Sequence, residues 1–211
     1  MIALVTGGAS SGKSAYAEQL ACSLPGNRFY LAAMKPYGEE GARRIERHRT
    51  LRAGKGFATV ECFEGFGEAF YVDQDLLSEG VSTALLESLG NVVANELFAD
   101  DWSCRPYDEV LNTVLDGVMR VADLFDNLVI VGDEVGGDGL RYDETTEAYI
   151  HLMGTIACAI AARCDLVVEC VAGQPFIIKG NQSASEGTVP GDAKRIGGDS
   201  PQRCSVEGGR A

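Results

Sequence analysis

Two patterns of hydrophobic positions follow one another along the chain. The first is a short apolar run without polar breaks, which is typical of a strand buried on both faces of a sheet. The second is a longer segment whose apolar residues recur at intervals of three and four, which predicts an amphipathic helix. The apolar runs predict strands at residues 2–6, 29–33, 57–62, 83–86, 128–131 and 166–171, and a short edge strand at 176–178.

The helical spacing is clearest in two segments. The first begins at Ser14, ends at Pro25-Gly26, and has its apolar positions at Ala17, Leu20, Ala21 and Leu24. The second follows Pro106 and carries on one face Val110, Val114, Val118, Val121 and Phe125. Further helices are expected at 39–52, 89–97 and 144–163. Because strands and helices alternate, the sequence predicts an α/β fold with a mainly parallel central sheet and helices on both faces.

Composition divides the 211 residues into two parts. Residues 1–179 contain all the predicted elements and fit one domain of ordinary size, although the Gly- and acid-rich connection at 64–80 has no clear pattern. Residues 180–211 lack aromatic side chains and are rich in Gly, Ser and charged residues. Such a segment buries too little apolar surface to offset the entropy cost of ordering, so we expect a disordered tail.

Charge and cysteine usage narrow the class of partner. The chain has 31 Asp and Glu against 18 Lys and Arg, and a net charge of this sign, −13, disfavours nucleic acid and anionic lipid as partners. No apolar stretch reaches the roughly 18–20 residues that cross a bilayer, and the first residues do not resemble an export signal, so we expect no membrane span and a cytoplasmic location. The seven cysteines contain no C-x-x-C pair, which argues against a zinc site or a disulfide framework, and we expect most of them to be buried.

A glycine-rich motif follows the first predicted strand and opens the first predicted helix. It matches G-x-x-x-x-G-K-[ST] at every position, with the residues Gly7, Gly8, Ala9, Ser10, Ser11, Gly12, Lys13 and Ser14. The glycines let the backbone curl so that N–H groups point at phosphate oxygens, and the helix N-terminus adds positive charge. Lys13 is expected to reach the β- and γ-phosphates and Ser14 to bind Mg²⁺. The context favours nucleotide binding over a glycine-rich turn with an incidental lysine.

A metal ion at such a loop needs a second acidic ligand. Glu87 comes directly after the apolar run 83–86, at the end of the strand where open α/β sheets bind their ligands. An ordinary carboxylate at a strand end would occupy the same position, so the position alone leaves both interpretations open.

The segment around His48 is basic, which is unusual in so acidic a chain. On a helix, Arg44, His48 and Arg52 lie at i, i+4 and i+8 and form one stripe. Neighbouring positive charge disfavours a protonated imidazole, and a neutral imidazole can attack phosphorus while arginines hold the phosphates. A solvated basic helix face with an incidental histidine explains the same pattern, and the residues alone favour it. The other histidine, His151, lies beside Leu152 in a predicted helix and is expected to be structural.

In their order along the chain, these motifs resemble the bifunctional adenosylcobinamide kinase / adenosylcobinamide-phosphate guanylyltransferase family. The resemblance extends over about residues 2–179. Its matching segments are LVTGGASSGKS, YLAA at 30–33, EEGARRIERHR ending at Arg49, LLES at 85–88, EVGGDG at 134–139 and VAGQPFIIKG near the end. The strand followed by the R-I-x-x-H helix and the E-V-G loop is far more specific than the glycine-rich motif alone.

The resemblance implies a P-loop NTPase-like fold and two reactions on a corrinoid. A hydroxyl of adenosylcobinamide is phosphorylated from ATP or GTP, and GTP then guanylylates a histidine that passes GMP to the cobinamide phosphate. The guanylylated histidine falls on His48, the phosphate-loop residues on Lys13 and Ser14, and the strand-end acid on Glu87. With this family in view, the nucleophile interpretation of His48 becomes the favoured one. The expected nucleotide contacts then include Arg44, Arg52 and Glu134, Mg²⁺ is the expected cofactor, and the expected assembly is a homotrimer.

The chain also departs from the family pattern. The family's Thr-Asn-Glu-Val-Gly run is Gly132-Asp133-Glu134-Val135-Gly136 here, and an Asn-Gln pair falls on Ala157 and Cys158. A common Trp is Phe57 and a common Asp is Gly38. These departures leave two alternatives open. One is a P-loop kinase of another small alcohol that lacks the guanylyl step, and the other is a nucleotide-dependent regulator without catalysis.

Overall fold

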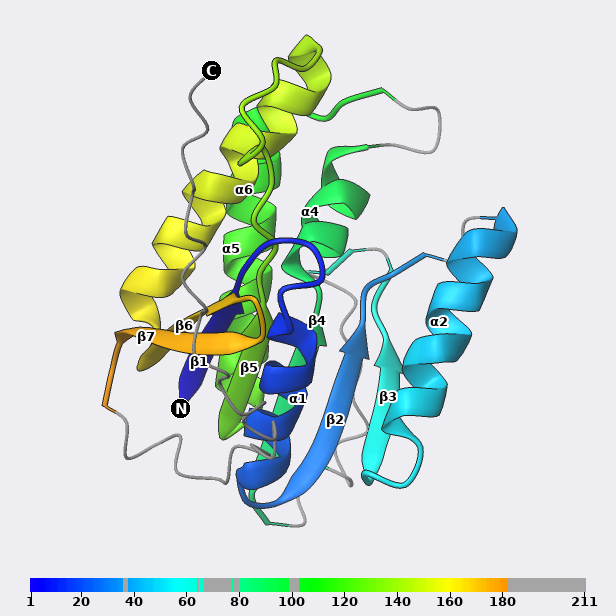
Figure 1. Ribbon diagram of the computed structural model, residues 1–211, viewed down its shortest axis with the longest axis vertical. Helices are drawn as coiled ribbons and strands as arrows, with labels where there is room; N and C mark the ends of the chain where they lie inside the picture. The colour runs from blue at the N-terminus through cyan, green and yellow to red at the C-terminus, as the bar shows by residue number, and fades with distance from the viewer. Residues whose placement is uncertain (36–37, 64, 67–76, 78–79, 99–102, 182–211) are drawn as a thin grey trace, which may run out of the picture.

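The computed structural model describes residues 1–35, 38–63, 65–66, 77, 80–98 and 103–181. In this part of the chain, a seven-stranded sheet has the order β3-β2-β4-β5-β1-β6-β7 (Figure 1). The strands are β1 (Ile2–Thr6), β2 (Asn27–Ala32), β3 (Phe57–Glu61), β4 (Ser82–Glu87), β5 (Asn127–Val131), β6 (Leu166–Val171) and β7 (Gln174–Lys179). All neighbouring pairs are parallel except β6 and β7. The predicted α/β fold with a mainly parallel sheet is confirmed.

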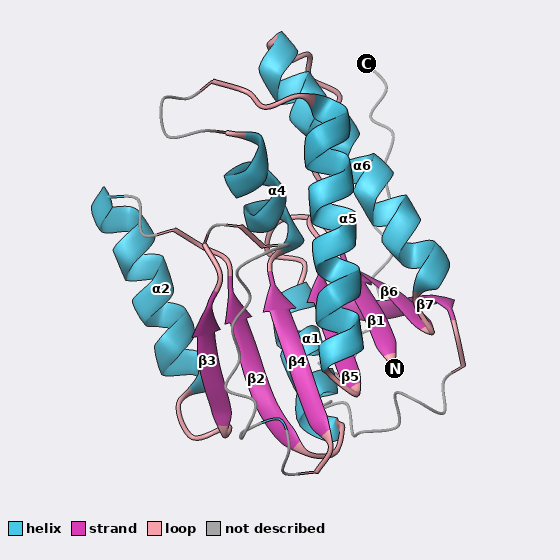
Figure 2. Cartoon of the chain, turned by 180° about the vertical axis from the view of Figure 1, so that it is seen from behind, coloured by secondary structure: helices cyan, strands magenta, loops and turns pink. Residues whose placement is uncertain are grey.

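Helices cover both faces of the sheet, as predicted. They are α1 (Lys13–Ser23), α2 (Gly38–Arg52), α4 (Leu89–Leu97), α5 (Tyr107–Leu124) and α6 (Glu144–Arg163). Helices α1 and α2 lie on the face that is turned to the viewer in Figure 1. Helices α4, α5 and α6 cover the opposite face, which Figure 2 shows from behind. The predicted elements differ from the observed ones by at most two residues at their ends, and the predicted edge strand 176–178 lies within the longer β7.

The alternation of side chains along β1 explains the two-sided core. Leu4 joins the apolar cluster beneath α4, α5 and α6, whereas Ala3 and Val5 join the cluster beneath α1. The stripe predicted on α5 is buried throughout, at Val110, Val114, Val118 and Val121, and Phe125 directly after the helix is buried as well. On α1, Ala17, Leu20 and Ala21 are buried against the other face. Hydrophobic periodicity therefore identified the residues that hold both layers to the sheet.

Strand order places three loops at one edge of the sheet. Strand β1 lies between β5 and β6, with Val5 opposite Val131 and Thr6 opposite Glu169. Strand β4 lies between β2 and β5, and Glu87 is opposite Ala32 at its end. Because the carboxyl ends of parallel strands share an edge, the segments after β1, β4 and β5 approach one another there. This is the edge at which open α/β sheets bind their ligands.

A tight turn joins the antiparallel strands β6 and β7. Its two residues, Ala172 and Gly173, have φ values of 50° and 78°. Positive φ at both positions is characteristic of the two-residue hairpin turn whose twist matches the flanking strands. The backbone N–H of Gly173 donates to the carbonyl of Ser11 at 2.9 Å, so this turn is attached to the glycine-rich loop after β1.

The remaining predictions concern the connection at 64–80, the tail, the cysteines, His151 and membrane spans. Most of the connection at 64–80 and all of the tail beyond 181 lie outside the described residues. The six described cysteines are free, and Cys62, Cys164 and Cys170 are buried, so the predicted burial holds for half of them. Nδ1 of His151 lies 2.9 Å from the Tyr107 hydroxyl, which joins α6 to α5. Among the described helices, none combines the length and apolar character needed to span a membrane.

Candidate active site

The loop between β1 and α1 has the backbone shape that its glycines predict. Gly7 and Gly12 have φ values of 150° and 92°, and Ser10 has a φ of 57°. Gly12 is the residue that precedes the first turn of α1. The loop therefore curls back over the start of the helix, where the partial positive charge of the helix N-terminus favours an anion.

Two of the loop glycines are required by close backbone contacts. A Cβ at Gly7 would lie 2.5 Å from the carbonyl oxygen of Cys170, and one at Gly12 would lie 3.2 Å from the Cα of Gly173. These neighbours are backbone atoms of β6 and of the β6–β7 turn, which cannot easily move aside. Because Gly7 and Gly12 have no side chains, the loop can lie against the end of β6. The hydrogen bond from the N–H of Gly173 to the Ser11 carbonyl holds it there.

Lys13 lies across this loop and pairs with an acid that follows β5. Its Nζ donates to the carbonyl of Gly8 at 3.1 Å and lies 3.2 Å from Oδ1 of Asp133. Both side chains are largely shielded, with 11% of Lys13 and 28% of Asp133 exposed. Partial burial strengthens such a pair relative to one on the open surface. The loop thus presents one lysine whose charge is balanced by one carboxylate.

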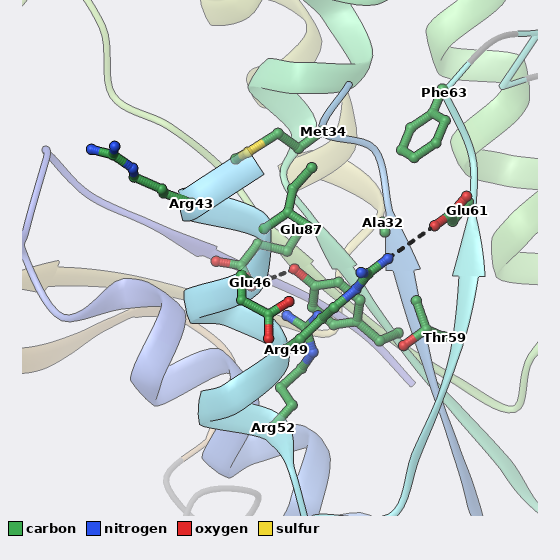
Figure 3. Close-up of a pocket in the computed structure, with 12 residues that line it drawn as sticks. Ala32, Met34, Arg43, Glu46, Arg49, Arg52, Thr59, Glu61, Phe63 and Glu87 are labelled. Atoms are coloured by element: carbon green, nitrogen blue, oxygen red, sulfur yellow. Dashed lines mark hydrogen bonds and ion pairs between the residues drawn. The ribbon is translucent and has the colours of Figure 1, made fainter. Parts of the chain in front are cut away.

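A second feature of the site is a cavity of about 550 Å³ between α2 and the ends of β2, β3 and β4 (Figure 3). Helix α2 contributes Arg43, Ile45, Glu46, Arg49 and Arg52 to its wall. The strands and the segments that follow them contribute Tyr30, Ala32, Met34, Thr59, Glu61, Phe63 and Glu87. Across the cavity, Nη2 of Arg49 reaches Oε1 of Glu61 at 3.4 Å (Figure 3). All three arginines of the cavity come from α2, and carboxylates from α2, β3 and β4 also line it, so the cavity suits a ligand that carries both phosphate and hydrogen-bond donors.

The wall of this cavity contains a stack of three side chains from three elements. The guanidinium of Arg52 lies over the ring of Tyr30, and the Tyr30 hydroxyl donates to Oε2 of Glu87 at 3.0 Å. Burial, aided by the charge of Glu87, raises the pKa of the Tyr30 phenol far above its ordinary value. The phenol therefore stays protonated and acts as the donor to Glu87. Arg52 is itself buried, which fixes its guanidinium at the cavity wall.

The structure brings some predicted site residues together and separates others. Lys13 and Ser14 open α1, and the backbone N–H of Glu134 donates to the carbonyl of Gly7 at 3.2 Å, so these three meet at the predicted phosphate loop, which comprises residues 7–14. Arg52 and Glu87 meet at the cavity instead. His48 and Arg44 lie in helix α2, but their side chains are outside the described part of the structure.

Sequence reasoning missed the contacts of two residues. Asp133 was noted for its departure from the family pattern, and the structure adds its ion pair with Lys13. Tyr30 was read as part of a buried strand, and the structure adds its contacts with Arg52 and Glu87. Both relationships depend on which strands are neighbours. The available signal for Asp133 was an acidic residue two positions after the apolar run 128–131.

The fold and the phosphate loop define an α/β protein of the P-loop NTPase type. The model of the family described as cobinamide kinase / cobinamide phosphate guanyltransferase matches residues 3–178. The chain belongs to this family, which confirms the resemblance identified from its motifs.

Curated relatives agree with this assignment. The bifunctional adenosylcobalamin biosynthesis protein CobP of Pseudomonas aeruginosa is 29% identical over 180 residues, covering 84% of this chain and 96% of the relative. The proteins named bifunctional adenosylcobalamin biosynthesis protein CobU of Escherichia coli and Salmonella typhimurium are each 28% identical, covering 85% of this chain and 100% of the relative. The description of the family and the names of these relatives, which call them bifunctional, agree with the two activities that the resemblance implied.

Proposed function

We propose that this protein phosphorylates adenosylcobinamide and then transfers GMP from GTP to the resulting phosphate by way of a guanylylated His48. The family and the two-part site support the proposal together. The phosphate loop and the cavity beside α2 provide separate places for a nucleotide's terminal phosphates and for a second phosphate-bearing group. The observation that carries the guanylyl step is the position of residue 48 on the helix that walls the cavity.

The kinase step is assigned to the phosphate loop. The loop amides and Lys13 would hold the β- and γ-phosphates of the triphosphate. The corrinoid hydroxyl oxygen then bonds to the γ-phosphorus as the bond to the β-phosphate oxygen breaks, and the hydroxyl proton is lost. Stabilising the charge that spreads over the transferred group is the main contribution a protein makes to such a reaction.

The residues around the loop fit a magnesium ion. Ser14 opens α1 beside Lys13, and carboxylates end or follow the neighbouring strands at Glu87 and Asp133. Hydroxyl and carboxylate oxygens are ligands that Mg²⁺ prefers, and Ser14 and Glu87 remain the proposed holders of the ion. In this structure Glu87 lies at the α2 cavity and accepts from Tyr30, so holding the ion would require Glu87 to turn towards the loop. When bound, the ion would neutralise phosphate charge.

The guanylyl step is assigned to α2 and its cavity. Ile45, Arg49 and Arg52 line the cavity, and position 48 has the helical spacing of the same face, because 45, 48, 49 and 52 follow the pattern i, i+3, i+4, i+7. Position 48 therefore shares this face of the helix with Arg49 and Arg52. Their guanidinium groups suit the phosphates of GTP, and the family's guanylylated histidine falls on His48.

The chemistry at His48 balances in two displacements. In the first, an imidazole nitrogen bonds to the α-phosphorus of GTP, and the bond to the β-phosphate oxygen breaks, releasing pyrophosphate. In the second, a phosphate oxygen of cobinamide phosphate bonds to the same phosphorus and the N–P bond breaks. The imidazole returns to its starting form, and the product is adenosyl-GDP-cobinamide. Each displacement needs cations around phosphorus, and the arginines of α2 would supply them.

Intact-mass measurement after incubation with GTP tests this function. The unaltered protein should gain the mass of one GMP and release pyrophosphate. His48→Ala should gain nothing while still phosphorylating cobinamide, and His151→Ala, a matched change at the other histidine, should form the adduct normally. An adduct that persists on His48→Ala would refute the assignment of the nucleophile.

The same measurement separates the proposal from the two alternatives. A kinase of another small alcohol would release ADP or GDP without a GMP adduct. A regulator without catalysis would bind nucleotide and turn over nothing when cobinamide is supplied.

The location and the assembly of the protein are proposed on other grounds. A reaction that consumes GTP implies a compartment rich in nucleoside triphosphates, so we propose the cytoplasm, and the homotrimer implied by the resemblance can be tested by light scattering during gel filtration.

A further inference from the structure

Asp133 is held next to the phosphate loop by backbone hydrogen bonds on both sides. The N–H of Gly132 donates to the carbonyl of Val5 at 2.8 Å, and that of Glu134 donates to the carbonyl of Gly7 at 3.2 Å. Both acceptors belong to β1 or to the first residue of the loop. The backbone of Asp133 is therefore held beside the loop, within reach of Lys13.

The second carboxylate oxygen of Asp133 faces the start of α4. A Cβ at Gly90 would lie 2.6 Å from Oδ2 of Asp133 and 3.1 Å from the hydroxyl of Tyr149. Gly90 is in the first turn of α4, where the helix dipole favours a negative charge. The Tyr149 hydroxyl donates to the carbonyl of Gly90 at 3.2 Å and so closes the same corner. The Asp133 carboxylate thus lies between Lys13 and the start of α4.

This arrangement has a consequence for ligands that reach Lys13. A nucleoside triphosphate without metal carries several negative charges, and at this loop it would meet a lysine that Asp133 already neutralises. The approaching phosphates would also be repelled by the fixed carboxylate. A nucleotide that brings a divalent cation supplies positive charge for both the phosphates and Asp133. In a partly buried site these interactions are screened much less than on the open surface.

We propose that Asp133 makes the phosphate loop selective for the magnesium complex of a nucleoside triphosphate over the free nucleotide. The inference rests on the proposed nucleotide binding at Lys13 and deepens it, since it names the ionic form of the ligand and the residue that selects it. Asp133 acts through its charge on Lys13 and on the bound phosphates. It is a specificity-determining residue, and the proposal assigns it no part in bond making.

Equilibrium binding of a non-hydrolysable GTP analogue to the full-length protein tests the proposal. Affinity is measured in excess Mg²⁺ and again in EDTA, without any corrinoid, and the ratio of the two dissociation constants is compared between variants. Asp133→Asn keeps the size of the side chain and removes its charge. We expect this change to narrow the ratio about tenfold, equivalent to about 1.4 kcal/mol, mainly because the free nucleotide binds more tightly.

Two further variants make the result decisive. Asp133→Ser, a smaller neutral side chain, should narrow the ratio in the same direction if charge is the cause. Asp116→Asn removes one negative charge from an exposed position on α5 and should leave the ratio as in the unaltered protein. If the ratio of dissociation constants in both Asp133 variants stays within twofold of its value in the unaltered protein, the inference is overturned. If no form of the protein binds the analogue in either condition, the proposed nucleotide site itself is wrong.

Discussion

The guanidinium carbon of Arg52 lies 3.2 Å from the centre of the Tyr30 ring. Arg52 ends α2 and Tyr30 lies in β2, so this contact holds the last turn of the helix against the sheet. A guanidinium stacked on an aromatic face keeps its N–H groups directed outward around its edge. The arrangement therefore fixes the helix and leaves the charge of Arg52 facing the cavity.

Tyr30→Phe should separate the two contacts of this tyrosine, because it keeps the ring under Arg52 and removes the donor to Glu87. The loss of a partly buried hydrogen bond to a carboxylate should lower the free energy of unfolding by about 1–2 kcal/mol. Urea denaturation measures this. The rate of GMP-adduct formation should fall several-fold, whereas Tyr30→Ala, which also removes the stacking surface, should lower both quantities further. Equal losses in the two variants would show that the hydroxyl carries the whole effect.

Gly7→Ala should prevent the phosphate loop from forming its observed shape. The new methyl group would lie 2.5 Å from the Cys170 carbonyl oxygen, and a φ of 150° is rarely adopted by alanine. We expect nucleotide affinity to fall at least tenfold, measured by titration with a fluorescent GTP analogue. Gly8→Ala is the matched control, because no atom lies within 4 Å of its added Cβ. Unchanged affinity in Gly7→Ala would contradict the role given to this glycine.

Leu86→Ala should weaken the core on the side of α4, α5 and α6. Leu86 is fully buried in that cluster, and removing a buried leucine typically costs about 2–5 kcal/mol of unfolding free energy. Leu140, which is 66% exposed, provides the comparison, since Leu140→Ala should change stability by no more than about 0.5 kcal/mol. Chemical denaturation of the two variants side by side is the measurement. If Leu86→Ala loses as little stability as Leu140→Ala, the cluster can collapse around the missing side chain and the prediction is wrong.

Stability should depend on the ionisation of Asp126. Its carboxylate accepts hydrogen bonds from the backbone N–H of Ser82 at 2.8 Å and from the Ser82 hydroxyl at 3.0 Å, and these bonds lower its pKa below the ordinary value of an aspartate. A lowered folded-state pKa means that the stabilisation is complete above the unfolded-state pKa and is lost as the pH falls through the folded-state value. Asp126→Asn should therefore be less stable than the unaltered protein at pH 7.

The difference between these two proteins should shrink as the pH falls below about 4, the ordinary range of an aspartate. Denaturation midpoints at a series of pH values provide the test. Asp123→Asn, at an exposed position near the end of α5, controls for the change in net charge. A stability difference that is independent of pH would show that Asp126 contributes through packing instead.

Much of the fold could be predicted from local pattern. Unbroken apolar runs identified the central strands β1, β4, β5 and β6 because a parallel sheet covered on both faces excludes most polar side chains. The stripe from Val110 to Val121 identified α5 for a related reason, since one face of the helix is buried throughout. The shape of the phosphate loop was predictable at Gly7 and Gly12, because both glycines have positive φ and close backbone contacts and stand at a fixed spacing in the sequence.

Relationships between distant residues could not be predicted in the same way. The sequence gives no strand order, so it could not show that Asp133 follows the neighbour of β1 and reaches Lys13. For the same reason, Glu87 was assigned by analogy to the phosphate loop, whereas its contact in the structure is with Tyr30. The exposed end of a strand looks alike in sequence whichever strand lies beside it. The choice between these acids therefore needed tertiary structure.

The pairing of β1 with β5 and β6 also sets a constraint on biosynthesis. Ala3 is opposite Leu166, and the N–H of Gly173 donates to Ser11, so residues of β1 and its loop find partners that are synthesised much later. Contacts so distant in sequence make folding slow. A nascent chain should therefore be unable to retain nucleotide until translation has passed the β6–β7 turn.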